Sequence, residues 1–139
     1  MCKNNDTSER ICIRLTSSEH GSLCQHPAAG PAQWSGDQIA LKHNGQTVAY
    51  TPRGFTRFEH CIDEVYVATD RLQLHYTGSD GVCITGLFVN GSRVLVRSRQ
   101  SFWIDSDDLF CPEDDNFLST TDITLSPNGS IISFGCKNG

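Results

Sequence analysis

An acidic segment carries the side chains with the most evident chemistry. The stretch SFWIDSDDLFCPEDDNFLS, residues 101–119, places six carboxylates within eleven positions around a single cysteine. They are Asp105, Asp107, Asp108, Glu113, Asp114 and Asp115. Carboxylates this close repel one another unless solvent, a cation or a basic partner neutralises them.

Calcium is the cation that these residue types suit best. Ca²⁺ takes about six to eight oxygen ligands from carboxylates, amides and backbone carbonyls. The aspartates before Cys111 and the acids after Pro112 can supply them from two arms of one loop. The spacing is not that of an EF-hand, because Phe110 stands where that loop needs glycine. The segment is therefore predicted to bind Ca²⁺, with a basic partner or a plain solvated turn as the alternatives.

The histidines are the first candidates for catalysis. His60 lies beside Cys61, but neighbouring residues on a strand point to opposite faces, so they cannot form a nucleophile–base pair. His43 precedes a hairpin turn, where we expect it to be exposed, and His20 and His26 have no third ligand near in sequence. No G-x-S-x-G, H-E-x-x-H or phosphate-loop motif occurs. We therefore expect a protein that is not an enzyme and has no catalytic residue.

Two tryptophans are candidates for ligand binding. Trp34 lies in the Pro- and Gly-rich stretch CQHPAAGPAQWSGD, where its ring is expected at the surface. Trp103 lies in the alternating run FWI, so it either fills the core or stacks on a ligand ring. A further loop, TGSDG at 77–81, either holds a cation through Asp80 or only turns the chain.

Seven cysteines indicate an oxidising compartment. They lie at least ten residues apart and form no C-x-x-C pair, so the pattern is that of disulfides rather than of a zinc site. Free buried thiols in a reducing compartment are the alternative. We predict three disulfides among Cys12, Cys24, Cys61, Cys83, Cys111 and Cys136. The favoured pair is Cys111–Cys136. We expect Cys2 to be free, disordered or used between chains.

Other features agree with secretion. Asn5, Asn90 and Asn128 each begin an N-x-S/T glycosylation motif. The first ten residues, MCKNNDTSER, are polar and contain no signal peptide, so we expect that the export signal has been removed. The chain is accordingly predicted to be a secreted, extracellular glycoprotein.

Length and charge limit the classes of function. The 139 residues suit one domain, with a flexible segment at 1–10 and the domain at 11–139. A net charge of −5 argues against nucleic-acid binding, and the apolar runs are too short to cross a bilayer. Arg93, Arg97 and Arg99 form the densest basic cluster, which we expect to be the solvent face of a strand.

Alternation of apolar and polar residues predicts about eight to ten short strands. Gly86 interrupts one of them and indicates a bulge or a close backbone approach. No segment has the apolar stripe of a helix, so the chain is predicted to be an all-β, disulfide-stabilised antiparallel β-sandwich, or a barrel-like variant of it. The predicted units are ICIRL (11–15) and four hairpins, namely 38–50 across Asn44-Gly45, 64–76 across a turn near Asp70, 82–98 across Asn90-Gly91 and 122–136 across Pro127-Asn128-Gly129.

The stretch FEHCIDEVYVATDRLQLHYTGSDGVCITGLFVNG, residues 58–91, resembles the closing half of a PLAT-type sandwich, the domain attached to lipoxygenases and lipases. The resemblance covers about a quarter of the chain. Cys83 and Ile84 stand where that family usually has a tryptophan in its final strand. The resemblance implies a binding or targeting module, often calcium-dependent, rather than an enzyme.

Together these features predict a secreted recognition module. Its loops would bind a carbohydrate, lipid or protein ligand, with Ca²⁺ as the expected cofactor. The alternative is a structural or matrix component of an extracellular assembly that has no small-molecule ligand.

Overall fold

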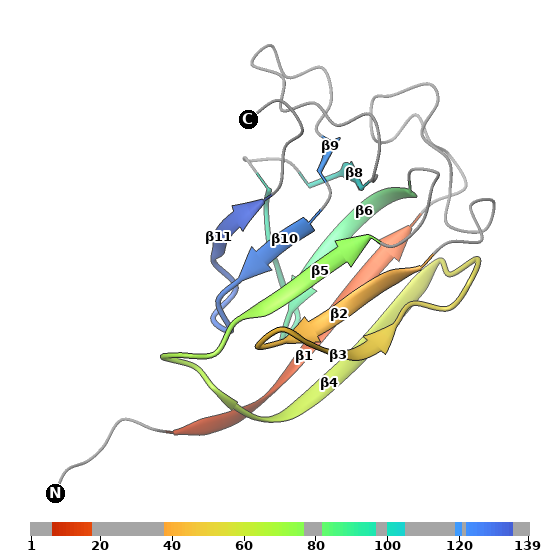
Figure 1. Cartoon of the computed structure of the whole chain (residues 1–139). Coiled ribbons are helices and arrows are strands. Elements are labelled where there is room, and N and C mark those ends of the chain that lie inside the picture. Colours follow the sequence, from red (N-terminus) through yellow and green to blue (C-terminus); the bar gives the residue numbers. More distant parts are fainter. Residues whose placement is uncertain are drawn as a thin grey trace, which may run out of the picture.

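The computed structural model describes residues 7–17, 38–76, 82–96, 100–104, 119–120 and 122–134. These residues form eleven strands in two sheets that pack face to face (Figure 1). They contain no helix, and the two sheets do not close into a barrel. The predicted all-β sandwich is therefore confirmed, and the barrel-like variant does not apply to the described ranges.

The first sheet has six strands. Its pairs are antiparallel except β8 and β9, which run parallel. In sheet order the strands are β4 (Arg57–Tyr66), β1 (Ser8–Ser17), β6 (Val82–Val89), β8 (Phe102–Ile104) and β9 (Ser119–Thr120), with β7 (Ser92–Arg93) paired to β6. Strand β1 begins at Ser8, ahead of the domain boundary predicted at residue 11.

The second sheet has five strands, all antiparallel. In sheet order they are β11 (Ile131–Phe134), β10 (Asp122–Leu125), β5 (Leu72–Tyr76), β2 (Ile39–His43) and β3 (Gln46–Tyr50). Within the described ranges, no helix occurs that could span a lipid bilayer.

The core lies between the sheets and is built by alternation. Along β1, β5 and β10 every second residue is buried, as a strand with one face on a core requires. Full burial of one such aliphatic side chain contributes roughly 1.5–3 kcal/mol. Buried residues of the first sheet include Ile11, Ile13, Leu15, Val65, Leu87 and Val89, and those of the second include Ile39, Leu41, Leu72, Leu74, Ile123 and Leu125.

Two hairpin turns were predicted correctly from their Asn-Gly pairs. Asn44 and Gly45 have φ of 51° and 86°, and Asn90 and Gly91 have φ of 50° and 84°. Positive φ at both central positions is the requirement of a type I′ turn. The strand after the second turn is shorter than predicted, since β7 is only Ser92–Arg93.

The hairpin predicted over residues 64–76 is wrong. Strand β4 pairs with β1 in the first sheet, whereas β5 pairs with β2 and β10 in the second. The chain therefore crosses from one sheet to the other between Tyr66 and Leu72. A hairpin and a connection between two sheets both consist of two alternating strands joined by a turn. The local sequence therefore does not distinguish the two arrangements.

Glu64 has a backbone conformation that is uncommon for a residue with a side chain. Its φ is 58°, in the left-handed region. Glu9 pairs with Val65 and Ile11 pairs with Ile62. Between these two pairs β1 has one residue and β4 has two, and Glu64 is one of the two. This extra residue makes a β-bulge, and left-handed backbone costs a non-glycine residue about 1–2 kcal/mol.

Replacing Glu64 by glycine should therefore raise the free energy of unfolding, by up to about 1 kcal/mol, because glycine has no Cβ to oppose this conformation. Urea unfolding measures the change. The matched control is Glu59→Gly on the same strand, where φ is not positive and glycine should lower stability by about 0.5–1 kcal/mol. Equal losses in the two variants would contradict the expectation.

Candidate functional site

Most of the predicted site residues lie outside the described residues. Strand β8 includes Trp103, opposite Cys83, but only the backbone of Trp103 is described. The calcium site, the role of Trp34 and the Cys111–Cys136 pair therefore stay predictions. The side chains concerned are Asp105, Asp107, Asp108, Glu113, Asp114, Asp115, Trp34, Asn5, Cys24, Cys111 and Cys136.

Three of the predicted disulfide cysteines are described. Cys12 on β1 and Cys61 on β4 lie directly opposite each other and are joined by a disulfide. Cys83 on β6 is also disulfide-bonded, to a partner outside the described residues. Because Cys61 is oxidised, it cannot act as a thiol nucleophile beside His60.

Three side chains stack on the outer face of the first sheet. Arg14 on β1 and Arg93 on β7 are the cross-strand partners of Phe88 on β6. The guanidinium carbon of Arg14 lies 4.2 Å from the centroid of the Phe88 ring, and that of Arg93 lies 4.7 Å away. Both distances are within the range of cation–π attraction. The two arginines come from the strands that flank β6, and we call this group the Arg–Phe–Arg stack.

Gly86 fixes where the ring lies. A Cβ at Gly86 would be 2.7 Å from Cε1 of Phe88 and 2.7 Å from the hydroxyl oxygen of Thr16. The ring therefore lies over bare backbone that any larger residue would occupy. Gly86 also lies at a register shift between β1 and β6, beside a 2.9 Å hydrogen bond between the hydroxyls of Thr16 and Thr85. The predicted bulge occurs here, and the close contacts with Gly86 come from the side chains of Phe88 and Thr16 rather than from another backbone.

Neither arginine has a carboxylate partner within the described residues. Among the described residues no ion pair involves either guanidinium, although Glu59 is the cross-strand neighbour of Arg14. Arg93 donates one N–H to the backbone oxygen of Thr85 at 3.3 Å. Two positive charges thus share one aromatic ring in a chain whose net charge is −5.

A pocket opens at the end of the sandwich where the tight turns lie. Its volume is about 220 Å³. The floor is apolar and the rim is polar, with one carboxylate. It is lined by Glu9, Ile11, Val67, Val89, Asn90, Ser92, Pro127 and Asn128.

Two of the predicted glycosylation asparagines border this pocket. The side-chain oxygen of Asn90 accepts the backbone N–H of Cys12 at 2.8 Å. That of Asn128 accepts the backbone N–H of Ser130 at 3.0 Å and the hydroxyl of Ser126. Within the described ranges neither side-chain nitrogen makes a hydrogen bond, and that nitrogen is the atom to which a glycan is attached. Two of the three asparagines predicted to carry glycans therefore lie at this pocket.

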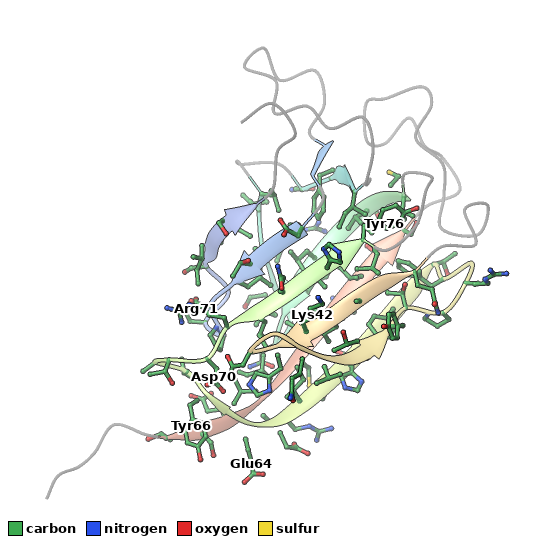
Figure 2. The ribbon with its side chains drawn as sticks, in the orientation of Figure 1. Lys42, Glu64, Tyr66, Asp70, Arg71 and Tyr76 are labelled. Carbon is green, nitrogen blue, oxygen red and sulfur yellow. A yellow bond between two sulfur atoms is a disulfide. The ribbon has the colours of Figure 1, made fainter. Side chains whose placement is uncertain are left out.

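A buried acid joins two turns at the same end. Oδ2 of Asp70 lies 2.8 Å from Nε2 of His43 and accepts the backbone N–H of Tyr66 at 2.9 Å. Asn44 exchanges hydrogen bonds with the backbone of Arg71 at 2.8 and 2.9 Å. Figure 2 shows Asp70, Tyr66 and Arg71 together at this corner. The cluster ties the β2–β3 turn to the connection that crosses between the sheets.

The environment of Asp70 favours its charged form. Burial alone would raise the pKa of this carboxyl, but hydrogen bonds from the Tyr66 N–H, the Asn44 side chain and His43, together with the His43 charge, lower its pKa to about 2. The exposed fraction of the His43 side chain is 20%, so the expectation of an exposed His43 is wrong. Its location before the turn was correct, but the buried acid across the corner was not visible in the local sequence.

Sequence reasoning missed the Arg–Phe–Arg stack because its members come from distant parts of the chain. Arg93 was identified only as part of an exposed basic cluster, and Arg14 was not identified. One local signal could have been used: a glycine two residues before an aromatic on a strand, as in Gly86-Leu87-Phe88, indicates a ring lying over backbone. In the described part of the chain, no three His, Cys, Asp or Glu side chains converge to hold a metal.

No family model, curated protein or solved structure matches this chain.

Proposed function

We propose that this chain is a secreted recognition module for acidic glycans, in which the Arg–Phe–Arg stack contacts the acidic group. The observation that carries the proposal is a pair of guanidinium groups held on one ring without a carboxylate partner among the described residues. Gly86 beneath the ring and the cross-strand register hold the three side chains in place before any ligand binds. A site held in this way loses little ordering entropy on binding.

The stack presents positive potential to an approaching ligand. Both guanidinium groups lie over the Phe88 ring, at 4.2 and 4.7 Å from its centroid, so two positive charges stand within a few ångströms of one another on the sheet surface. Each guanidinium has five N–H donors, and within the described residues Arg93 uses one and Arg14 uses none. A carboxylate or sulfate can accept such donors in pairs.

The net charge of the chain decides between classes of anionic ligand. An anionic membrane attracts each basic residue by only about 1 kcal/mol, which two arginines in a chain of charge −5 do not turn into stable binding. A long polyanion such as a nucleic acid needs many phosphate contacts and would meet the same repulsion. A single acidic group on a sugar needs only the local contact. The proposed ligand is therefore a glycan with isolated carboxylate or sulfate groups.

Two features of the sequence support a recognition module of this kind. The resemblance of residues 58–91 to PLAT-type domains implies binding or targeting, and this stretch includes Phe88 and Gly86. The acidic segment 105–115 is proposed to add a Ca²⁺ site through the carboxylates named above. A bound calcium ion would also reduce the negative charge that an acidic ligand meets.

The experiment is a glycan array carrying neutral, carboxylated and sulfated glycans, with and without calcium, followed by titration of the best ligand. We expect acidic glycans to be retained. Arg14→Gln and Arg93→Gln should each weaken binding about tenfold or more, because each removes a charged hydrogen-bond donor. Arg53→Gln is the matched control, since Arg53 is an exposed arginine outside the stack, and it should bind like the parent.

Each other result would replace the proposal. Retention on anionic liposomes but on no glycan would make lipid the ligand. Calcium-dependent binding that survives both arginine substitutions would move the contact to the acidic segment. If no glycan or liposome is retained under any condition, the result would favour the structural or matrix alternative over the proposal.

A further inference from the structure

Among the described strands, β4 leaves a long edge of the first sheet unpaired. It runs for ten residues, Arg57–Tyr66, and pairs with β1 on one side only (Figure 1). On its other side, from Arg57 to Val65, no backbone group hydrogen-bonds to another part of the described chain. Such an edge is a template for a further strand.

We propose that two copies of this chain pair through β4, antiparallel, about a two-fold axis at His60. A two-fold contact uses the same surface on both copies, so residue i meets residue j and residue j meets residue i. Directly opposite residues of two antiparallel strands point to the same side of the sheet, and side chains alternate along each strand. The two copies therefore keep their outer faces on the same side only if the two-fold axis lies level with a residue rather than between two residues. This leaves a small number of registers to compare.

The register centred on His60 matches on both faces of the sheet. It places Arg57 opposite Asp63 of the second copy, twice, on the outer face. It places Phe58 opposite Ile62 of the second copy, twice, on the face toward the core, where Ile62 is buried and Phe58 half-buried. Opposite charges and apolar pairs directly across two strands each contribute roughly 0.2–1 kcal/mol.

Neighbouring registers are worse. An axis at Glu59 places that carboxylate against its own copy, and an axis at Cys61 places Glu59 against Asp63 twice. Like charges directly opposite each other destabilise strand pairing. An axis closer to the end of β4 would include Glu64 among the paired residues. The φ of 58° and the β-bulge at Glu64 interrupt the regular backbone that strand pairing requires. An axis nearer the start of β4 overlaps only a few residues.

Apolar side chains of β3 lie beside this edge. Figure 1 shows β3 and β4 along the same side of the sandwich, joined by residues 51–56. Val48 is 39% exposed and Tyr50 is 52% exposed, and both lie on β3. They offer the second copy apolar surface next to the paired strands.

The dimer goes beyond the proposed function and has one consequence for it. With the axis perpendicular to the sheet, the outer faces of both first sheets point the same way. Each face carries an Arg–Phe–Arg stack, so the dimer would present two anion contacts on one continuous surface. A glycan with two acidic groups at a suitable spacing could then bind both copies at once.

The test is sedimentation velocity of the whole chain without ligand, over about 1 µM to 1 mM, the range of weak to moderate affinities. We expect concentration-dependent dimerisation. Arg57→Glu and Asp63→Lys should each weaken it about tenfold, because each places like charges opposite each other twice. The double variant Arg57→Glu with Asp63→Lys restores the opposite charges and should restore the dimer.

The control is Lys42→Glu, which reverses a charge on β2 of the second sheet, away from the β4 edge, and should leave the dimer unchanged. An equal loss of the dimer in Lys42→Glu would show that net charge, rather than the contacts of this register, controls association, and would overturn the proposal. A parent that is monomeric throughout, or a double variant that does not recover, would overturn the proposal. Circular dichroism checks that each variant is folded. If the parent is monomeric and still binds acidic glycans, the dimer proposal is wrong and the proposed function is unaffected.

Discussion

Replacing Cys12 and Cys61 together by alanine should lower the free energy of unfolding by about 4 kcal/mol. The disulfide joins residues that are 49 positions apart, and closing a loop of this length restricts the unfolded chain strongly. It also links β4 to β1, the strand that holds β4 in the first sheet. Urea unfolding of the double variant under non-reducing conditions measures the loss.

The control for this prediction is a neighbouring pair on the same two strands. Arg10 and Asp63 form an ion pair of 3.6 Å with side chains that are 69% and 79% exposed. Exposed ion pairs contribute about 0–1 kcal/mol, so alanine at both positions should change stability little. If the cysteine variant loses no more than this control, the covalent link between β1 and β4 is not a main source of stability.

The strands and turns of this fold were predictable because their signals are local. The alternation in ICIRL predicts a strand with one buried face, and this prediction does not depend on which strand pairs with it. Ile11, Ile13 and Leu15 are all buried. Asn44-Gly45 and Asn90-Gly91 predict their turns because few other residue pairs adopt two successive positive φ values.

Pairing between strands was less predictable because it depends on distant segments. The runs on either side of Asp70 were expected to pair with each other, yet β4 pairs with β1 and β5 with β2 and β10. What distinguishes the corner from a hairpin is Asp70, which is buried and bonded to His43 of another strand. No pattern within residues 64–76 reveals that contact.

The candidate site was unpredictable for the same reason. Arg14, Phe88 and Arg93 meet only because β6 pairs with β1 on one side and with β7 on the other. The net charge of −5 did not indicate this local pair of positive charges, because the net charge of a chain does not describe how charges are distributed on its surface.

Asp70→Asn should lower the free energy of unfolding by about 2 kcal/mol at pH 7. The pKa of Asp70 is about 2 in the folded chain against an ordinary value of 3.8. A difference of one unit corresponds to about 1.4 kcal/mol of preference for the charged form. The side chain is only 10% exposed, so solvent screens its contacts with His43 and the Tyr66 N–H little. Asparagine keeps the shape but removes the charge.

The loss should depend on pH in one direction. Because the pKa of Asp70 is lower in the folded than in the unfolded chain, its contribution is fully present above about pH 4–5 and disappears as the pH falls toward 2. Thermal or urea unfolding from pH 7 to pH 2 should therefore show the parent and Asp70→Asn converging in acid. Asp63→Asn, at an exposed position, should stay within about 0.5 kcal/mol of the parent throughout. A gap for Asp70→Asn that keeps its full size at pH 2 would show that shape and hydrogen bonding, rather than the charge, hold this corner.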